Sequence, residues 1–285
     1  MYLLRFIFIL LLSASTQAGV LTSIKPLELI VQELVPEGVV VSSLLPAQVS
    51  PHDYALKLTD LKRLKTTDFF VWVGPGMEPF LVDAVARFVP KSRQLQMSSD
   101  EIEVHHDGHD HSYSVHLWLS YVNAQAFASK LAPYIKRLYP EAKSEVDQKL
   151  ANFKQLAAME FEKTQRAFEL SGKPPFFVYH DAYQEYVDEF KLAQLASIKV
   201  VPDAQLSLHR VIELNREADE ARCLLVNLDE IEQAKSLAEK LKLMPVSLDL
   251  LGVGSKDVAP PSDYFSYMAQ IRSAFLTCFA GGHTR

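Results

Sequence analysis

Between Glu141 and Leu170 the chain reads EAKSEVDQKLANFKQLAAMEFEKTQRAFEL, about 30 residues without glycine or proline. Apolar residues recur on one helical stripe with charges between them, at Val146, Leu150, Phe153, Ala157, Phe161 and Phe168. The pattern predicts a single helix of about 45 Å, which is long for a globular domain. A glycine and two prolines in residues 171–175 end it.

The segments on both sides of this helix alternate between strand and helix patterns. Before it, we predict a strand running into a helix over 20–31, a strand at 39–45, a helix from 59, a strand at 69–74 and a helix at 78–88. After it, we predict strands at 176–179, 224–226 and 245–248, and helices at 183–190, 205–215, 230–241 and 264–279. Such alternation is typical of βαβ units with parallel strands. The predicted fold class is α/β, with two α/β lobes of mostly parallel sheet joined by one long rigid helix.

The first 18 residues have the pattern of a secretory signal peptide. Arg5 supplies a positive charge, Phe6 to Leu12 form an apolar run too short to span a bilayer, and Thr16 and Ala18 suit a cleavage site. An uncleaved anchor is the alternative. No later segment is long and apolar enough to cross a membrane, so we expect an exported chain that does not span one.

These patterns divide the chain into four parts. We expect a signal peptide at 1–18, an amino-terminal α/β lobe at 19–140, a linking helix at 141–172 and a carboxy-terminal α/β lobe at 173–285. Residues 101–113 interrupt the first lobe with a polar, acidic and histidine-rich segment, which predicts a surface loop.

Charge and cysteine content limit the classes of partner and of metal site. The net charge is -6 and no lysine or arginine cluster is present, which argues against nucleic acid as a partner. The two cysteines, Cys223 and Cys278, favour a disulfide in an exported chain, with two buried thiols as the alternative. Two cysteines cannot build a Cys₄ site, and a Cys₂His₂ site is not expected either.

Three of the nine histidines lie at the ends of predicted elements. His52 follows the strand at 39–45, His116 follows the histidine-rich segment, and His180 ends the strand that opens the second half. Ligands of open α/β sheets bind outside the carboxyl ends of strands, where His52 and His180 are placed. A single histidine is more often packed in a core or exposed, and separations of about 64 residues imply no local geometry. The residues alone therefore suggest a metal site without establishing it.

Five short motifs occur in a specific order along the chain. They are PHDYAL at 51–56, VWVGPGME at 71–78, HLWLS at 116–120, HDAY at 180–183 and SLDLLG at 247–252. This ordered set resembles the ZnuA-type zinc-binding proteins of ABC importers, within the wider group of receptors for zinc, manganese and iron. The resemblance covers essentially the whole mature chain, including the histidine-rich segment and the paired cysteines.

The resemblance implies that a metal lies between the two lobes. The family's three histidine ligands match His52, His116 and His180, and Asp249 matches a carboxylate ligand of manganese-binding relatives. Asp249 is therefore the candidate fourth ligand, with water in that position, or a role only in shaping the pocket, as alternatives. Three imidazoles and one oxygen suit tetrahedral Zn²⁺, whereas manganese prefers more carboxylate; copper and nickel also accept imidazoles.

The resemblance also implies a function. A periplasmic receptor would capture Zn²⁺ and deliver it to the ABC transporter permease in the inner membrane, acting as a monomer and not as an enzyme. The histidine-rich segment offers a weaker second zinc site at His105, His106, His109 and His111. One departure from the family concerns residues 226–230, VNLDE, where zinc-binding members often carry a Glu-Pro pair; no ligand is predicted there.

Three other readings compete with a zinc receptor. A manganese or iron receptor would share the fold, and an adhesin would need only an exposed surface. A secreted zinc hydrolase would also use three protein ligands and a water molecule. The chain contains no His-Glu-x-x-His motif and no recognisable nucleophile motif, which argues against the hydrolase.

Overall fold

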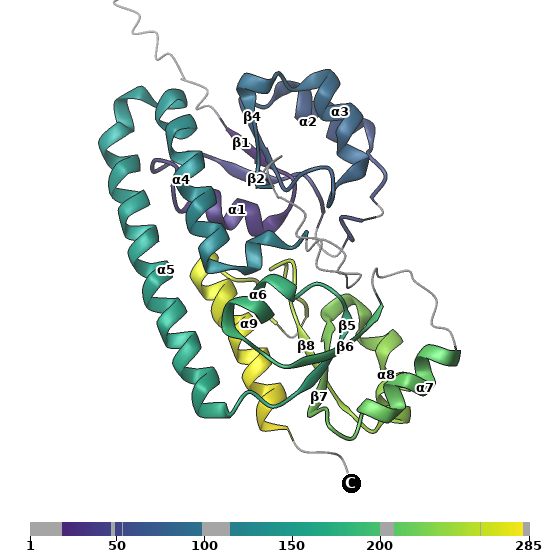
Figure 1. Cartoon of the computed structure of the whole chain (residues 1–285). Coiled ribbons are helices and arrows are strands. Elements are labelled where there is room, and N and C mark those ends of the chain that lie inside the picture. The colour runs from purple at the N-terminus through teal and green to yellow at the C-terminus, as the bar shows by residue number, and fades with distance from the viewer. Residues whose placement is uncertain are drawn as a thin grey trace, which may run out of the picture.

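The computed structural model describes residues 19–46, 49–52, 54–98, 115–199, 208–256 and 258–281, with the backbone alone for 208–211 (Figure 1). It contains two four-stranded sheets, and every recorded strand pair is parallel. One sheet precedes the long helix in sequence and the other follows it, so the predicted fold class is confirmed.

The first sheet has the strand order β2-β1-β3-β4. Its strands are β1 (Val20–Thr22), β2 (Val41–Ser43), β3 (Phe69–Trp72) and β4 (Gln94–Gln96). The helices of this lobe are α1 (Lys25–Gln32), α2 (Leu58–Thr66), α3 (Val82–Phe88) and α4 (Tyr121–Leu138). All four residues of β3 are buried, which explains why this strand reads as a continuous apolar run.

The second sheet has the order β6-β5-β7-β8. Its strands are β5 (Phe176–His180), β6 (Gln194–Lys199), β7 (Cys223–Asn227) and β8 (Met244–Leu248). The helices are α6 (Gln184–Phe190), α7 (Leu208–Glu217), α8 (Ile231–Leu241) and α9 (Tyr264–Ala280). Alternate residues of β5 enter two different cores, because side chains of a strand point to opposite faces of the sheet.

The linking helix is α5 (Lys143–Ser171), which runs along one side of both lobes in Figure 1. Its buried residues include Val146, Phe153, Ala157 and Phe168, all on the predicted stripe. The helix ends at Gly172, whose φ of 75° lies in the left-handed region that glycine adopts without strain.

The last helix joins the lobes through a shared hydrophobic core. α9 packs against α5, β7 and β8, and also contacts α1 of the first lobe. One continuous core therefore contains residues of both sheets, α4, α5 and α9. A separate core lies on the opposite face of the second sheet, under α7 and α8.

The sequence patterns do not predict α4, β4 or β6. β4 has three residues, too few for an alternating pattern to be distinguished from a loop. α4 contains Pro133, a residue that ordinarily marks a helix boundary. Among the described residues, no helix combines the length and the apolar character needed to cross a bilayer.

The predicted disulfide is confirmed. Cys223 at the start of β7 and Cys278 in α9 are bonded, with their Cα atoms 5.4 Å apart. Both residues are fully buried. The bond therefore ties the final helix, which completes the shared core, to an inner strand of the second sheet.

Removing this disulfide should reduce the free energy of unfolding by about 4 kcal/mol, because a closed loop of 55 residues restricts the unfolded chain. The Cys223→Ala/Cys278→Ala double variant and the reduced wild-type protein should show similar losses in denaturant titrations. Equal unfolding midpoints for oxidised and reduced protein would contradict the expectation.

Candidate metal centre

His116 lies directly before a 3₁₀ turn, Leu117–Leu119, which leads into α4. Its ring packs edge-on against the buried Trp118, with 5.3 Å between the ring centroids. Trp118 Nε1 donates a hydrogen bond to the hydroxyl of Tyr267 at 3.0 Å, and the Tyr264 hydroxyl donates to the Trp118 carbonyl at 3.0 Å. Both tyrosines belong to α9, so the turn that presents His116 is anchored to the last helix.

The other two histidines come from the end of a strand and from a loop. His180 is the last residue of β5 and is 3% exposed. It continues the strand face of Phe176 and Val178, which enter the core shared by the two lobes. His52 belongs to the segment that follows β2, and its backbone N–H donates to Ser50 Oγ at 3.2 Å.

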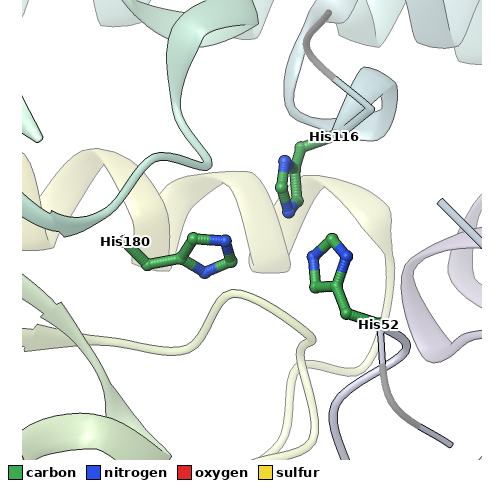
Figure 2. A group of neighbouring side chains, drawn as sticks. All are labelled: His52, His116 and His180. Carbon is green, nitrogen blue, oxygen red and sulfur yellow. The ribbon is translucent and has the colours of Figure 1, made fainter. Parts of the chain in front are cut away.

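The three imidazole rings converge on one point (Figure 2). The ring centroids are 5.6 Å apart for His52 and His116, 5.5 Å for His52 and His180, and 5.3 Å for His116 and His180. Each ring offers a nitrogen, and these nitrogens lie within 4.8 Å of one another. Nitrogens bound to one tetrahedral Zn²⁺ at about 2.0–2.1 Å are separated by about 3.4 Å, so the cluster has the dimensions of a three-histidine metal site.

The electrostatics of the cluster favour a bound cation. The Nε2 atoms of all three histidines are buried and have no hydrogen-bond partner among the described residues. Burial lowers the pKa of His52, and burial with the charges of the other two rings lowers that of His116 well below its usual value. Burial, assisted by the charges of His52 and Lys199, lowers the pKa of His180 to about 3. The rings are therefore neutral at pH 7, which is the form that binds metals.

A small cavity of about 20 Å³ surrounds the cluster, which is the size of a single ion or water molecule. Organic ligands require cavities of several hundred Å³. The wall is built from both lobes and from the loop after β8: Ser50, Pro51, His52, Met77, His116, His180, Asn227, Asp229, Glu230, Leu250 and Leu251.

Sequence reasoning missed three polar residues of this wall, Asn227, Asp229 and Glu230. They lie at the carboxyl end of β7 or directly after it, and the strand-end rule that favours His52 and His180 would also have selected them. Burial raises the pKa of Asp229, and the nearby charge of Asp249 adds to this effect. The departure from the family pattern at 226–230 therefore lies beside the cluster.

Asp249 does not belong to the cluster of mutually close ligand atoms. Its carboxylate oxygens accept hydrogen bonds from the backbone N–H groups of Val253 at 3.2 Å and Gly254 at 2.6 Å. The side chain thus braces its own loop, in which Gly254 has a φ of 72°. This geometry does not support Asp249 as the fourth ligand. The proposed weak site at His105, His106, His109 and His111 lies outside the described residues.

A histidine triad between two α/β lobes joined by a long helix is the arrangement of solute-binding receptors for metal ions. The model of the family described as "ZnuA: Zinc-uptake complex component A periplasmic" matches residues 20–278. The chain belongs to this family, a family of receptors rather than enzymes, and its family membership argues against the hydrolase reading.

Individual relatives agree with this assignment. The chain is 29% identical to the high-affinity zinc uptake system protein ZnuA of Yersinia pestis over 92% of this chain and 91% of the relative. Its fold is similar to the periplasmic zinc-binding protein TroA of Treponema pallidum, with a TM-score of 0.78, 14% identity and coverage of 93% and 99%. A Mn-bound periplasmic metal-binding protein from Candidatus Liberibacter asiaticus has a TM-score of 0.76 at 14% identity, with coverage of 92% and 99%.

The lowered pKa values predict that the first equivalent of Zn²⁺ displaces few protons. At pH 6, three histidines with the ordinary pKa of about 6.5 would release about two protons on binding a metal. Because all three pKa values lie below that value in the folded protein, we expect clearly fewer. Calorimetric titration in buffers of different ionisation enthalpy measures the number. Release of two or more protons would show that the imidazoles are charged before binding.

Proposed function

We propose that this chain is a zinc receptor that captures Zn²⁺ between its lobes and delivers it to an ABC importer. The observation that carries the proposal is the convergence of three neutral imidazoles, each with a buried Nε2 atom that has no partner among the described residues. His52, His116 and His180 would each supply one nitrogen to the ion. The zinc ion is the cargo of the receptor and takes part in no reaction.

The ligand chemistry favours zinc over manganese. Neutral imidazole suits zinc, copper, nickel and iron, whereas manganese prefers carboxylate and water oxygens. A manganese-bound structure exists among proteins of similar fold, so the fold alone does not select the metal. The selectivity we propose comes from three nitrogen ligands in a cavity with room for one small ion.

Location and partner follow from the family. The family description and the Yersinia pestis relative support a periplasmic component of a zinc uptake system. We propose that residues 1–18 are removed on export and that the monomeric, loaded receptor docks on the permease in the inner membrane. Residues 19–140 and 173–285 would form the two lobes, with the linking helix at 141–172.

The fourth position of the ion would be occupied by water rather than by Asp249. Both carboxylate oxygens of Asp249 already accept backbone hydrogen bonds, and moving them to the ion would leave the N–H groups of Val253 and Gly254 without their acceptor.

The deciding experiment is a titration of the metal-stripped mature protein with Zn²⁺ against a chelator of known affinity, with excess Mn²⁺ present. We expect one tight equivalent that manganese does not displace. The variants His52→Ala, His116→Ala and His180→Ala should each weaken it by at least about 100-fold, because a lost ligand costs more than a lost supporting contact.

His209→Ala is the matched control for these variants. His209 belongs to α7, which packs on the face of the second sheet opposite His180, and its replacement should leave the affinity unchanged. Absence of a tight equivalent in the wild-type protein, or ready displacement of zinc by manganese, would refute the proposal.

Asp249→Asn provides a test of the fourth position. If water completes the coordination shell, this variant should change the zinc affinity less than threefold while lowering thermal stability, since one of two backbone hydrogen bonds loses its acceptor. A loss as large as that of the histidine variants, without a change in stability, would instead identify Asp249 as a ligand.

We also propose a weaker zinc site in the histidine-rich segment, at His105, His106, His109 and His111. Four imidazoles and neighbouring carboxylates are suitable donors, and ordering the segment would cost entropy. The same titration would show it as a second, weaker equivalent that disappears when the four histidines are replaced together by alanine.

A further inference from the structure

Two carboxylates of α6 contact the first turn of α4. Glu189 Oε1 accepts hydrogen bonds from Ser120 Oγ at 3.0 Å and from the Val122 N–H at 2.9 Å. Glu189 Oε2 accepts one from the Tyr121 N–H at 3.0 Å. These contacts, which we call the α4–α6 latch, join a helix of the first lobe to a helix of the second.

A second contact and a local cap extend the latch. Asn123 Nδ2 donates to Glu185 Oε2 at 2.6 Å, and the Asn123 N–H donates to Ser120 Oγ at 3.0 Å. The first N–H groups of any helix lack partners within the helix. In α4, those of residues 121 and 122 are satisfied by a side chain from the other lobe.

The latch is stronger than an ordinary helix cap. A negative charge at a helix N-terminus interacts favourably with the helix dipole. Hydrogen bonds from neutral donors to an ionised carboxylate are stronger than those between neutral groups. Glu189 is also partly buried, which reduces screening by water.

The latch lies next to two of the three histidines. His116 precedes Ser120 by four residues, through the buried 3₁₀ turn Leu117–Leu119. His180 precedes the start of α6 at Gln184 by four residues. Because these connections are short, they limit how far either ring can move relative to the latch.

The 3₁₀ turn is therefore held at two points by the second lobe. Trp118 within the turn is bonded to the tyrosines of α9, and Ser120 at its end is bonded to Glu189 of α6.

We propose that Glu189, assisted by Glu185, is a positioning residue that holds His116 at its distance from His180 before any metal arrives. This inference rests on the proposed zinc-receptor function. Without the latch, the ion would have to bring the two imidazoles together itself, and part of its binding free energy would be spent on that ordering.

The test is the zinc affinity of Glu189→Gln. A glutamine side chain has one acceptor oxygen instead of two, and its NH₂ group cannot accept from the N–H groups of α4. We expect binding to weaken about tenfold, within the range measured for groups that orient metal ligands. The electronic absorption spectrum of bound Co²⁺ should also change, since it reports the geometry of the ligand set.

Asn123→Ala is a milder variant, which removes only the contact with Glu185. It should weaken zinc binding in the same direction by a smaller factor, and it serves as the test should Glu189→Gln not fold. Both the affinity and the Co²⁺ spectrum are measured on the full mature chain.

Two controls separate positioning from general effects of charge and stability. Asp188→Asn removes a charge from the exposed face of α6, where the Asp188 carboxylate accepts only from Gln184 among its recorded hydrogen bonds. Leu214→Ala destabilises the core on the far face of the second sheet. Both should retain the wild-type zinc affinity and Co²⁺ spectrum.

The outcomes are distinguishable. If the wild-type protein binds no zinc tightly, the proposed function is refuted, and the positioning role of Glu189 is refuted with it. If the wild-type protein binds tightly and the Glu189→Gln and Asn123→Ala variants match its affinity and spectrum, only the positioning role is refuted. A loss of affinity in Leu214→Ala equal to that in Glu189→Gln would also refute it, since stability alone would then explain the effect.

Discussion

The packing of α9 against α5 determines where the two halves of the metal centre lie. α5 passes beside both lobes, and α9 returns from the second sheet to contact both α5 and α1 (Figure 1). Aromatic pairs support this contact, with 5.6 Å between the rings of Phe153 and Tyr264 and 6.1 Å between those of Phe168 and Phe275. Separating the lobes would expose a shared apolar core, which opposes any wide opening.

A fixed relation between the lobes permits an otherwise unfavourable arrangement of imidazoles. Three buried rings keep their Nε2 atoms without hydrogen-bond partners in the described chain, and buried polar groups of this kind destabilise a fold. The surrounding core has to offset this cost. A cation bound at their centre would supply the missing interactions.

The carboxylate of Asp249 braces the loop after β8. Asp249 accepts two backbone hydrogen bonds from its own loop, while the neighbouring Leu250 and Leu251 line the cavity. The Leu250 N–H in turn donates to Asn227 Oδ1 at 3.0 Å, which connects the loop to the end of β7. The carboxylate therefore shapes the apolar part of the wall, and the size of the cavity depends on it.

Local patterns determined much of this protein. The helical stripe from Val146 to Phe168, the alternation of strands and helices, and the placement of His52 and His180 at strand ends follow from residues near one another in sequence. His116 was assigned as a metal ligand through the family resemblance and not through a local pattern. The elements α4 and β4 escaped prediction because a proline in the first and the very short length of the second obscured their periodicity.

Tertiary structure alone decided which of these residues meet. The convergence of three histidines about 64 residues apart depends on the packing of α9 and α5, and no spacing in the sequence encodes it. The partners of Asp249 were likewise decided by folding, since its carboxylate accepts hydrogen bonds from the backbone of its own loop. Sequence periodicity records which face of an element is buried, whereas the direction and partner of a polar side chain are set by groups that the chain brings close only after folding.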